Sequence, residues 1–342
     1  MTETPACLTP CPVCGATDTE PVASVDGKTG EPLATVNCNP CGLGRIDPLP
    51  TPQALEDWYT NRYRQDYKSA IQPALRHVLR AGRNALHRWR WLQDQMQSQG
   101  LALPPGATTL DIGASSGEFV YLLKQRGYQS HGIEPHTGYA SHARETLGVQ
   151  VENGSLNQVL PQKSDGQFHF ISMFHVLEHL TDPLDSLRQL RRKAGPQGCL
   201  LIEVPNATRF CSPRYMFFKA HTLYFTQTSL HQTLQAAGWR VVAHNHASDD
   251  NLMVLTQAAD SNAAAHTPTW QPSRALVEAQ QRRKWPAYLA QQLMSGRFIH
   301  KLAKRQEEKR AARPFDSSRA LLDDLYQSTA AARSEVQTQA HG

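Results

Sequence analysis

The sequence predicts an α/β fold around a seven-stranded sheet whose last strand is antiparallel, and three features indicate it. Strand-like and helix-like segments alternate between about residues 108 and 258, as in a parallel sheet with crossover helices. A glycine-containing turn, LDIGASSGEF, joins the first strand to the first helix. The last two strand-like segments are separated by little more than SDD, whereas a parallel pair needs a crossover of roughly a dozen residues. They should therefore form an antiparallel hairpin.

The core of this fold is expected over residues 105–260. The helix between the fourth and fifth strands has clear ends, because Asp182 can cap it and Pro183 suits the first helical position, where no N–H is needed. Gly195-Pro196 should stop this helix. In chain order, the seven expected strands are TLDIGA, QSHGIEP, VQVEN, FHFISMF, CLLIEVP, WRVVAHNHA and NLMVLTQ.

Residues 1–48 are expected to form a zinc ribbon. The segment is rich in turn residues and carries two Cys-x-x-Cys pairs, each followed by glycine. Four thiolates complete the tetrahedral shell of Zn²⁺ and leave no position for water, which predicts a structural site; a disulfide or redox pair is the alternative. The four expected ligands are Cys11, Cys14, Cys38 and Cys41.

The segments that flank the core are expected to be helical. Residues 49–104 predict a lid or connector, in which Tyr59, Tyr63 and Tyr67 repeat at helical spacing and should pack in a core or lid. Residues 261–342 hold roughly 13 basic and 7 acidic side chains, and they predict a basic, helical or partly disordered tail. No apolar run is long enough to span a membrane and no secretory signal is seen, so we expect a soluble, cytoplasmic protein.

The turn after the first strand predicts a cofactor site. Asp111 precedes a D-x-G-x-x-x-G pattern with Gly113 and Gly117, which lets the backbone approach a ligand at a helix start. The segment LDIGASSGEF resembles motif I of class I S-adenosylmethionine-dependent methyltransferases, with Ser115 in place of the middle glycine. This resemblance implies a Rossmann-like core that binds S-adenosylmethionine, with Asp111 orienting the methionine amino group.

The resemblance extends over further segments of the core. Glu134, at the end of the second strand, matches the acid that binds both ribose hydroxyls, and a carboxylate suits such a diol. Ser155 and Leu156 match the place where backbone and apolar groups hold adenine. Phe174 and His175 end the fourth strand, where the family faces the transferred methyl group; His175 is expected to act as a base or an orienting donor, or else only to line the cofactor.

The segments HVLEHL and HTLYFT are similar to a branch of sugar and natural-product methyltransferases, in which a zinc ribbon often precedes the core. In its sugar C-methylating members the histidine at the position of His221 is a proposed base, preceded by a glutamate. Ala220 takes that place here, which favours O- or N-methylation over C-methylation. Glu178 and His179 form a pair that lacks a third metal ligand, so a structural role is expected for them.

These features predict methyl transfer to a small molecule, sugar or glycan, with His221 and His175 as catalytic residues. An RNA methyltransferase that grips phosphates with the ribbon and tail is one alternative, although the tail's charges come with acids rather than interleaved aromatic residues. A non-enzymatic cofactor-binding scaffold is a second. A Rossmann-like oxidoreductase is a third, disfavoured by the glycine spacing and the terminal hairpin.

Overall fold

The computed structural model describes residues 9–51, 53–54, 73–246, 248–259, 269–295 and 297–339. Contacts divide the chain into two compact units: Met1–Ser69 with Met173–Ser295, and Ala70–Ser172 with Gly296–Gly342. Of the expected lid or connector, residues 52 and 55–72, with Tyr59, Tyr63 and Tyr67, lie outside the described residues.

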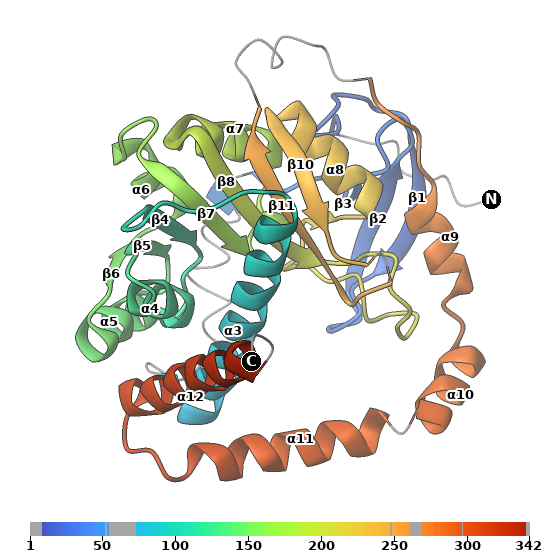
Figure 1. The fold of residues 1–342 in the computed structure, drawn as a ribbon. Coiled ribbons are helices and arrows are strands. Elements are labelled where there is room, and N and C mark those ends of the chain that lie inside the picture. Colours follow the sequence, from blue (N-terminus) through green and yellow to red (C-terminus); the bar gives the residue numbers. More distant parts are fainter. Residues whose placement is uncertain are drawn as a thin grey trace, which may run out of the picture. The chain divides into compact units, whose positions relative to one another are not determined.

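The predicted seven-stranded sheet is confirmed, with the strand order β10-β11-β8-β7-β4-β5-β6 (Figure 1). Strands β4, β5 and β6 pair in parallel, whereas β11 is antiparallel to both β8 and β10. The terminal hairpin is therefore formed as its short connection requires. The strands are β4 Thr108–Ile112, β5 Gln129–Glu134, β6 Gln150–Asn153, β7 Phe168–Phe174, β8 Ala194–Pro205, β10 Trp239–His244 and β11 Asn251–Ala258.

Short helices connect the parallel strands of the second unit. Helix α4 follows β4 and buries all of its first six residues, while β5 is followed by α5 and a π-helical turn, η2. Gly132 in β5 is required by close packing, because a Cβ there would lie 2.7 Å from that of Ala114. The helical segments of this part are α4 Glu118–Gln125, α5 Thr137–His142, η2 Ala143–Leu147, α6 Leu156–Val159 and η3 Leu160–Gln162.

The C-terminal tail is helical, as predicted, and two of its helices belong to the second unit. Both α11 (Arg297–Ala312) and α12 (Ser318–Gln339) contact the long helix α3 (Leu75–Ser98) (Figure 1). Glu308, whose side chain is buried, forms a bidentate pair with Arg80 of α3. Tyr326 is fully buried and donates its hydroxyl to the Glu118 carbonyl at 2.9 Å. The tail is thus part of the packed core of this unit.

The first unit contains a four-stranded antiparallel sheet with the order β1-β2-β3-β9. Its first three strands come from the N-terminal segment, but β9 comes from the region after the fifth core strand and pairs with β3. The turn after β1 is held by Asp26, which accepts backbone N–H bonds from Lys28, Thr29 and Lys219. The strands are β1 Thr19–Val25, β2 Pro32–Cys38, β3 Gly44–Ile46 and β9 Leu223–Tyr224.

Helix α7 of the first unit begins where its capping residue predicts. Asp182 accepts the Asp185 N–H at 2.9 Å, and Pro183 is the first residue of α7. This helix ends at Lys193 and β8 begins at once, so Gly195 and Pro196 lie inside the strand and not in a separate turn. The remaining helices are η4 Leu177–His179, α7 Pro183–Lys193, α8 Gln227–Ala236, α9 Ala275–Arg282 and α10 Trp285–Ser295. Among the described residues, no helix combines the length and apolar character needed to cross a membrane.

Candidate active site

The loop between β4 and α4 has the backbone conformation of a ligand-binding turn. Gly113 and Gly117 have φ values of +73° and +90°, and Gly117 is the N-cap of α4. A Cβ at Gly117 would lie 2.8 Å from that of Ala143, so both conformation and space require glycine. Ser115 also has a positive φ, +50°, which is uncommon for a non-glycine residue. Serine therefore adopts the left-handed backbone that the resemblance assigns to a glycine.

Glu134 ties this loop to the end of β5. One carboxylate oxygen accepts the Ser115 N–H at 2.8 Å, and the other accepts the His136 N–H at 2.8 Å. The side chain is largely buried. A carboxylate has about four acceptor positions, so a group held by two backbone donors can also accept from a ligand.

Asp111 lies near the carboxyl end of β4, the strand that pairs with β5. Burial raises the pKa of its carboxyl to about 7, although a hydrogen bond from the Ser172 hydroxyl at 2.6 Å opposes the shift. A second buried acid, Glu118, accepts the Ser116 hydroxyl at 2.6 Å. The loop is thus surrounded by three carboxyl groups, which suits a ligand with a positive charge and hydroxyl donors.

The predicted adenine-binding residues follow β6 in the same unit. Ser155 is the N-cap of α6 and forms a capping box with Gln158, whose side chain accepts the Ser155 N–H at 3.0 Å. Leu156 is buried at the first position of the helix. The second unit therefore holds seven of the eight residues predicted to bind cofactor: Asp111, Gly113, Ser115, Gly117, Glu134, Ser155 and Leu156. The eighth, Phe174, ends β7 and belongs to the first unit.

A cluster of histidines and glutamates in the first unit follows β7. His175 has a φ of +56°, and its ring nitrogens lie 3.2 Å from Glu178 Oε1 and 3.4 Å from Glu203 Oε1. Burial disfavours its charged form, but the two glutamates outweigh burial and raise the pKa of His175 to about 9. At neutral pH this ring is a cation that donates two hydrogen bonds, which suits an orienting donor better than a base.

His221 lies next to the Glu178-His179 pair in the structure. Ligand atoms of Glu178, His179 and His221 all lie within 4.8 Å of one another, so a third side chain of ligand type lies beside the Glu178-His179 pair, which its sequence position did not indicate. His221 is held there by the next residue, Thr222, which donates to the carbonyls of Glu178 and Leu180. Burial and the neighbouring His179 lower the pKa of His221 to about 2, so this ring is neutral.

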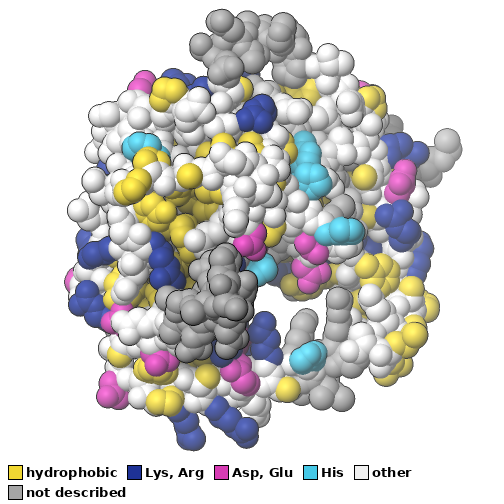
Figure 2. Space-filling view, in the orientation of Figure 1, with side chains coloured by type: hydrophobic (Ala, Val, Ile, Leu, Met, Phe, Trp, Pro, Cys, Tyr) yellow, Lys and Arg dark blue, Asp and Glu magenta, His cyan; other side chains and the backbone are white. Residues whose placement is uncertain are grey.

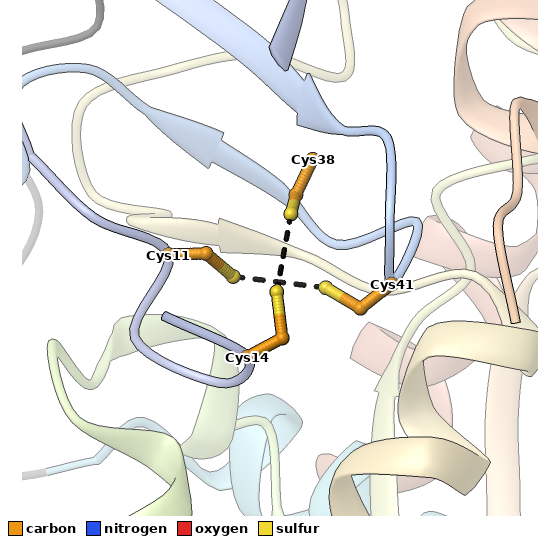
Figure 3. A group of neighbouring side chains, drawn as sticks. All are labelled: Cys11, Cys14, Cys38 and Cys41. Carbon is orange, nitrogen blue, oxygen red and sulfur yellow. Dashed lines mark hydrogen bonds between the residues drawn. The ribbon is translucent and has the colours of Figure 1, made fainter. Parts of the chain in front are cut away.

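The four predicted zinc ligands meet at one point, with their sulfur atoms directed toward a common centre (Figure 3). The Sγ–Sγ distances are 3.6 Å between Cys11 and Cys41 and 3.4 Å between Cys14 and Cys38. A tetrahedral Zn²⁺ with bonds of about 2.3 Å places its sulfur ligands roughly 3.8 Å apart, so the four thiolates fit this ion with a small expansion. None of the four cysteines is in a disulfide.

Sequence reasoning missed three functional candidates: Ser172, which bonds Asp111, and the buried acids Glu118 and Glu203. Each has a signal in the sequence, because a hydroxyl or carboxyl group stands in an otherwise apolar run or in the first turn of a buried helix. Glu203 also accepts the Asn251 amide at 2.7 Å, a partner on β11 that no local pattern indicates.

Comparisons with known proteins agree with this geometry. Residues 84–244 match the sequence profile of a family described as methyltransferase domain. Ubiquinone biosynthesis O-methyltransferase from Pseudomonas paraeruginosa is 28% identical over 124 residues, which cover 35% of this chain and 50% of that protein. Its counterpart from Pseudomonas aeruginosa gives the same identity and coverage. This chain thus spans about half the length of the curated relatives that it matches.

Two solved structures are also similar to part of this chain. A methyltransferase dependent on S-adenosylmethionine from Aquifex aeolicus is 21% identical, with a TM-score of 0.41, and covers 50% of this chain and 89% of its own. A possible histamine N-methyltransferase from Thermotoga maritima is 20% identical, with a TM-score of 0.38, and covers 54% of this chain and 99% of its own.

Proposed function

We propose that this protein transfers a methyl group from S-adenosylmethionine to an oxygen or nitrogen atom of a small molecule, sugar or glycan. The observation that carries the proposal is the loop of residues 113–117 held by Glu134 beside the buried Asp111, within the matched methyltransferase domain. Two carboxyl groups at the ends of neighbouring parallel strands suit a ligand with an ammonium group and a ribose diol.

In this proposal the cofactor supplies the electrophilic methyl group, and the protein binds and orients the reactants. Asp111 holds the methionine ammonium, Glu134 accepts the ribose hydroxyls, and the backbone of residues 113–117 lies against the ligand. Ser155, Leu156 and Phe174 provide the remaining cofactor contacts. His175 and His221 act on the acceptor. The O-methyltransferase names of the curated relatives support oxygen as the methylated atom.

The zinc ribbon has a structural role in this proposal. Four cysteines occupy all positions of a tetrahedral Zn²⁺, which leaves none for a substrate or water. The backbone carbonyl of Cys41 also accepts a hydrogen bond from the Gln232 side-chain amide of α8 at 3.3 Å, which connects the cysteine cluster to this helix. The ion would therefore hold the ends of β2 and the N-terminal turn in place.

No observation favours an RNA acceptor. Among the described side chains on the face seen in Figure 2, Lys and Arg are interspersed with Asp and Glu. In the tail, Glu307 and Glu308 pair with Arg83 and Arg80 of α3, so acids of the tail meet arginines of the same unit. Phosphate binding requires unpaired basic side chains along a surface.

The proposal is tested by calorimetric titration of the zinc-loaded protein with S-adenosylmethionine, with its demethylated product and with NAD. We expect micromolar binding of the first two and none of NAD. Transfer of a labelled methyl group is then measured on sugar, nucleotide-sugar and phenolic acceptors. A folded protein that binds NAD, or that binds none of these ligands, contradicts the proposal.

The acceptor role of His221 has its own test. The His221→Ala variant should bind S-adenosylmethionine with nearly unchanged affinity, because His221 lies outside the predicted cofactor residues, while its kcat falls. Normal turnover in the folded variant would remove His221 from the catalytic residues.

A further inference from the structure

We propose that Glu178, His179 and His221 bind a divalent transition-metal ion, at a second metal site besides the four cysteines. The ligand atoms of these three residues lie within 4.8 Å of one another. Metal bonds to histidine nitrogen and carboxylate oxygen are about 2.0–2.2 Å, so two ligands of one ion lie at most roughly 4.3 Å apart. Small side-chain rotations would bring all three atoms to bonding distance.

The tautomer of His179 is the one that a metal ligand needs. Its Nδ1 lies 2.6 Å from the carbonyl oxygen of Ala220, and since a carbonyl can only accept, the proton is on Nδ1. The lone pair is therefore on Nε2, which lies 3.9 Å from Glu178 Oε1. A backbone carbonyl that fixes the outer nitrogen of a ligating histidine is a common feature of metal sites.

One carboxylate oxygen of Glu178 lacks a hydrogen-bond donor among the described residues. Its side chain is buried, with a residue exposure of 1%, and Oε1 is 3.2 Å from His175 Nδ1. Its other oxygen, Oε2, is buried and has no hydrogen-bond partner within the part of the chain that the structure describes. A buried carboxylate oxygen without a donor is costly, and a metal ion would satisfy it.

The three ligands are held by the backbone and not only by their side chains. Glu178 and His179 lie in the short helix η4, and the residue after His221 bonds to this helix and to the residue that follows it: the Thr222 N–H donates to the Glu178 carbonyl at 2.9 Å, and its hydroxyl donates to the Leu180 carbonyl at 2.7 Å. The segment just before β9, which carries His221 and Thr222, is thus fixed against η4. A preformed arrangement of this kind lowers the entropic cost of binding an ion.

The ligand set indicates the class of ion and the use of the site. Two imidazole nitrogens and one carboxylate suit Zn²⁺, Co²⁺, Fe²⁺ or Mn²⁺ better than Ca²⁺, and three protein ligands leave positions open for water or another oxygen. We infer that an oxygen of the methyl acceptor takes an open position. This last step rests on the proposed function, whereas metal binding itself does not.

The test uses the full-length protein with zinc retained in the four-cysteine site. After dialysis against a weak chelator, it is titrated with Co²⁺ while visible d–d absorption and near-ultraviolet thiolate charge transfer are recorded. We expect one equivalent of Co²⁺ to bind, with d–d bands and without thiolate charge transfer. His221→Ala and the volume-conserving Glu178→Gln should each weaken this binding at least tenfold.

His231→Ala is the matched control. His231 is also a partly buried histidine whose ring lies near another, with 5.1 Å between its centroid and that of His244, and its Nε2 has no partner among the described residues. It belongs to no described cluster of ligands, so this variant should bind Co²⁺ as the wild type does.

Three outcomes would overturn the proposal: no Co²⁺ binding by the folded wild type, binding with thiolate charge transfer only, or binding that neither Glu178→Gln nor His221→Ala reduces. Circular dichroism identifies a variant that fails to fold, and the Glu178→Gln variant then decides. Calorimetry with S-adenosylmethionine on the same samples separates this result from a failure of the proposed function.

Discussion

Replacing Glu134 by glutamine should weaken the binding of S-adenosylmethionine without unfolding the protein. The carboxylate accepts two backbone N–H bonds of 2.8 Å, from Ser115 and His136. Glutamine keeps one acceptor oxygen, but it removes the charge and places an amide donor against one of these N–H groups. The variant therefore loses the acceptor for one ribose hydroxyl and loosens the loop that Glu134 holds.

The magnitude follows from the type of bond. A hydrogen bond to a charged group contributes about 1.5–3 kcal/mol, and 1.4 kcal/mol is a factor of ten in affinity. We expect the dissociation constant from calorimetry to rise about 10- to 150-fold. Glu152→Gln is the control, because Glu152 lies in the neighbouring strand β6, its side chain is 45% exposed and it pairs with Lys163. Its affinity should change by less than about twofold.

A cofactor analogue without ribose hydroxyls distinguishes direct contact from disturbance of the loop. If Glu134 binds the diol, the analogue binds weakly to the wild type, but it loses little further affinity in Glu134→Gln, as a double-mutant cycle requires. If the variant only disturbs the loop, the analogue and the cofactor lose affinity by the same factor. Equal losses, or unchanged affinity for S-adenosylmethionine, would refute the assigned role.

Three further predictions follow from the described contacts. Because burial raises the pKa of Asp111 to about 7, the affinity for S-adenosylmethionine should fall as the pH decreases below 7, where the carboxyl loses its charge; Asp111→Asn should bind weakly at every pH tested by calorimetry. Arg80 lowers the pKa of Glu308, so their pair stabilises the fold above the unfolded pKa of glutamate, about 4.3, and this contribution is lost as the pH falls through the lower folded pKa. Arg80→Ala should accordingly lower the Tm at pH 7, and the difference from wild type should shrink as the pH is lowered below the unfolded pKa of about 4.3; a difference that does not change with pH would contradict the role of the pair. Tyr326→Phe keeps the buried ring but removes its hydrogen bond, and denaturant unfolding should show a loss of about 0.5–1.5 kcal/mol, whereas no loss would mean that the bond has no net value.

Several parts of the fold and the site could be predicted because their determinants are local. The Asp182-Pro183 helix start depends on one side chain and the backbone next to it. The glycine turn depends on φ values that only a few residue types accept, and the short link before β11 leaves no geometry but a hairpin. The terminal hairpin and the glycine turn therefore follow from spacing and residue type alone.

The histidine cluster and the docking of the tail depend on contacts between distant segments. His221 joins Glu178 and His179 because Thr222 bonds to the carbonyls of Glu178 and Leu180 and because β9 pairs with β3, and no pattern in the segment itself indicates either contact. The sequence of the tail predicts basic helices with weak amphipathic character. In the structure the buried Glu308 and Tyr326 fix the tail to α3 and α4. By itself the sequence determined the sheet, the glycine turn after β4 and the set of cysteines. Only the tertiary structure decided which polar side chains meet, because burial and partners set both their protonation and their possible ligands.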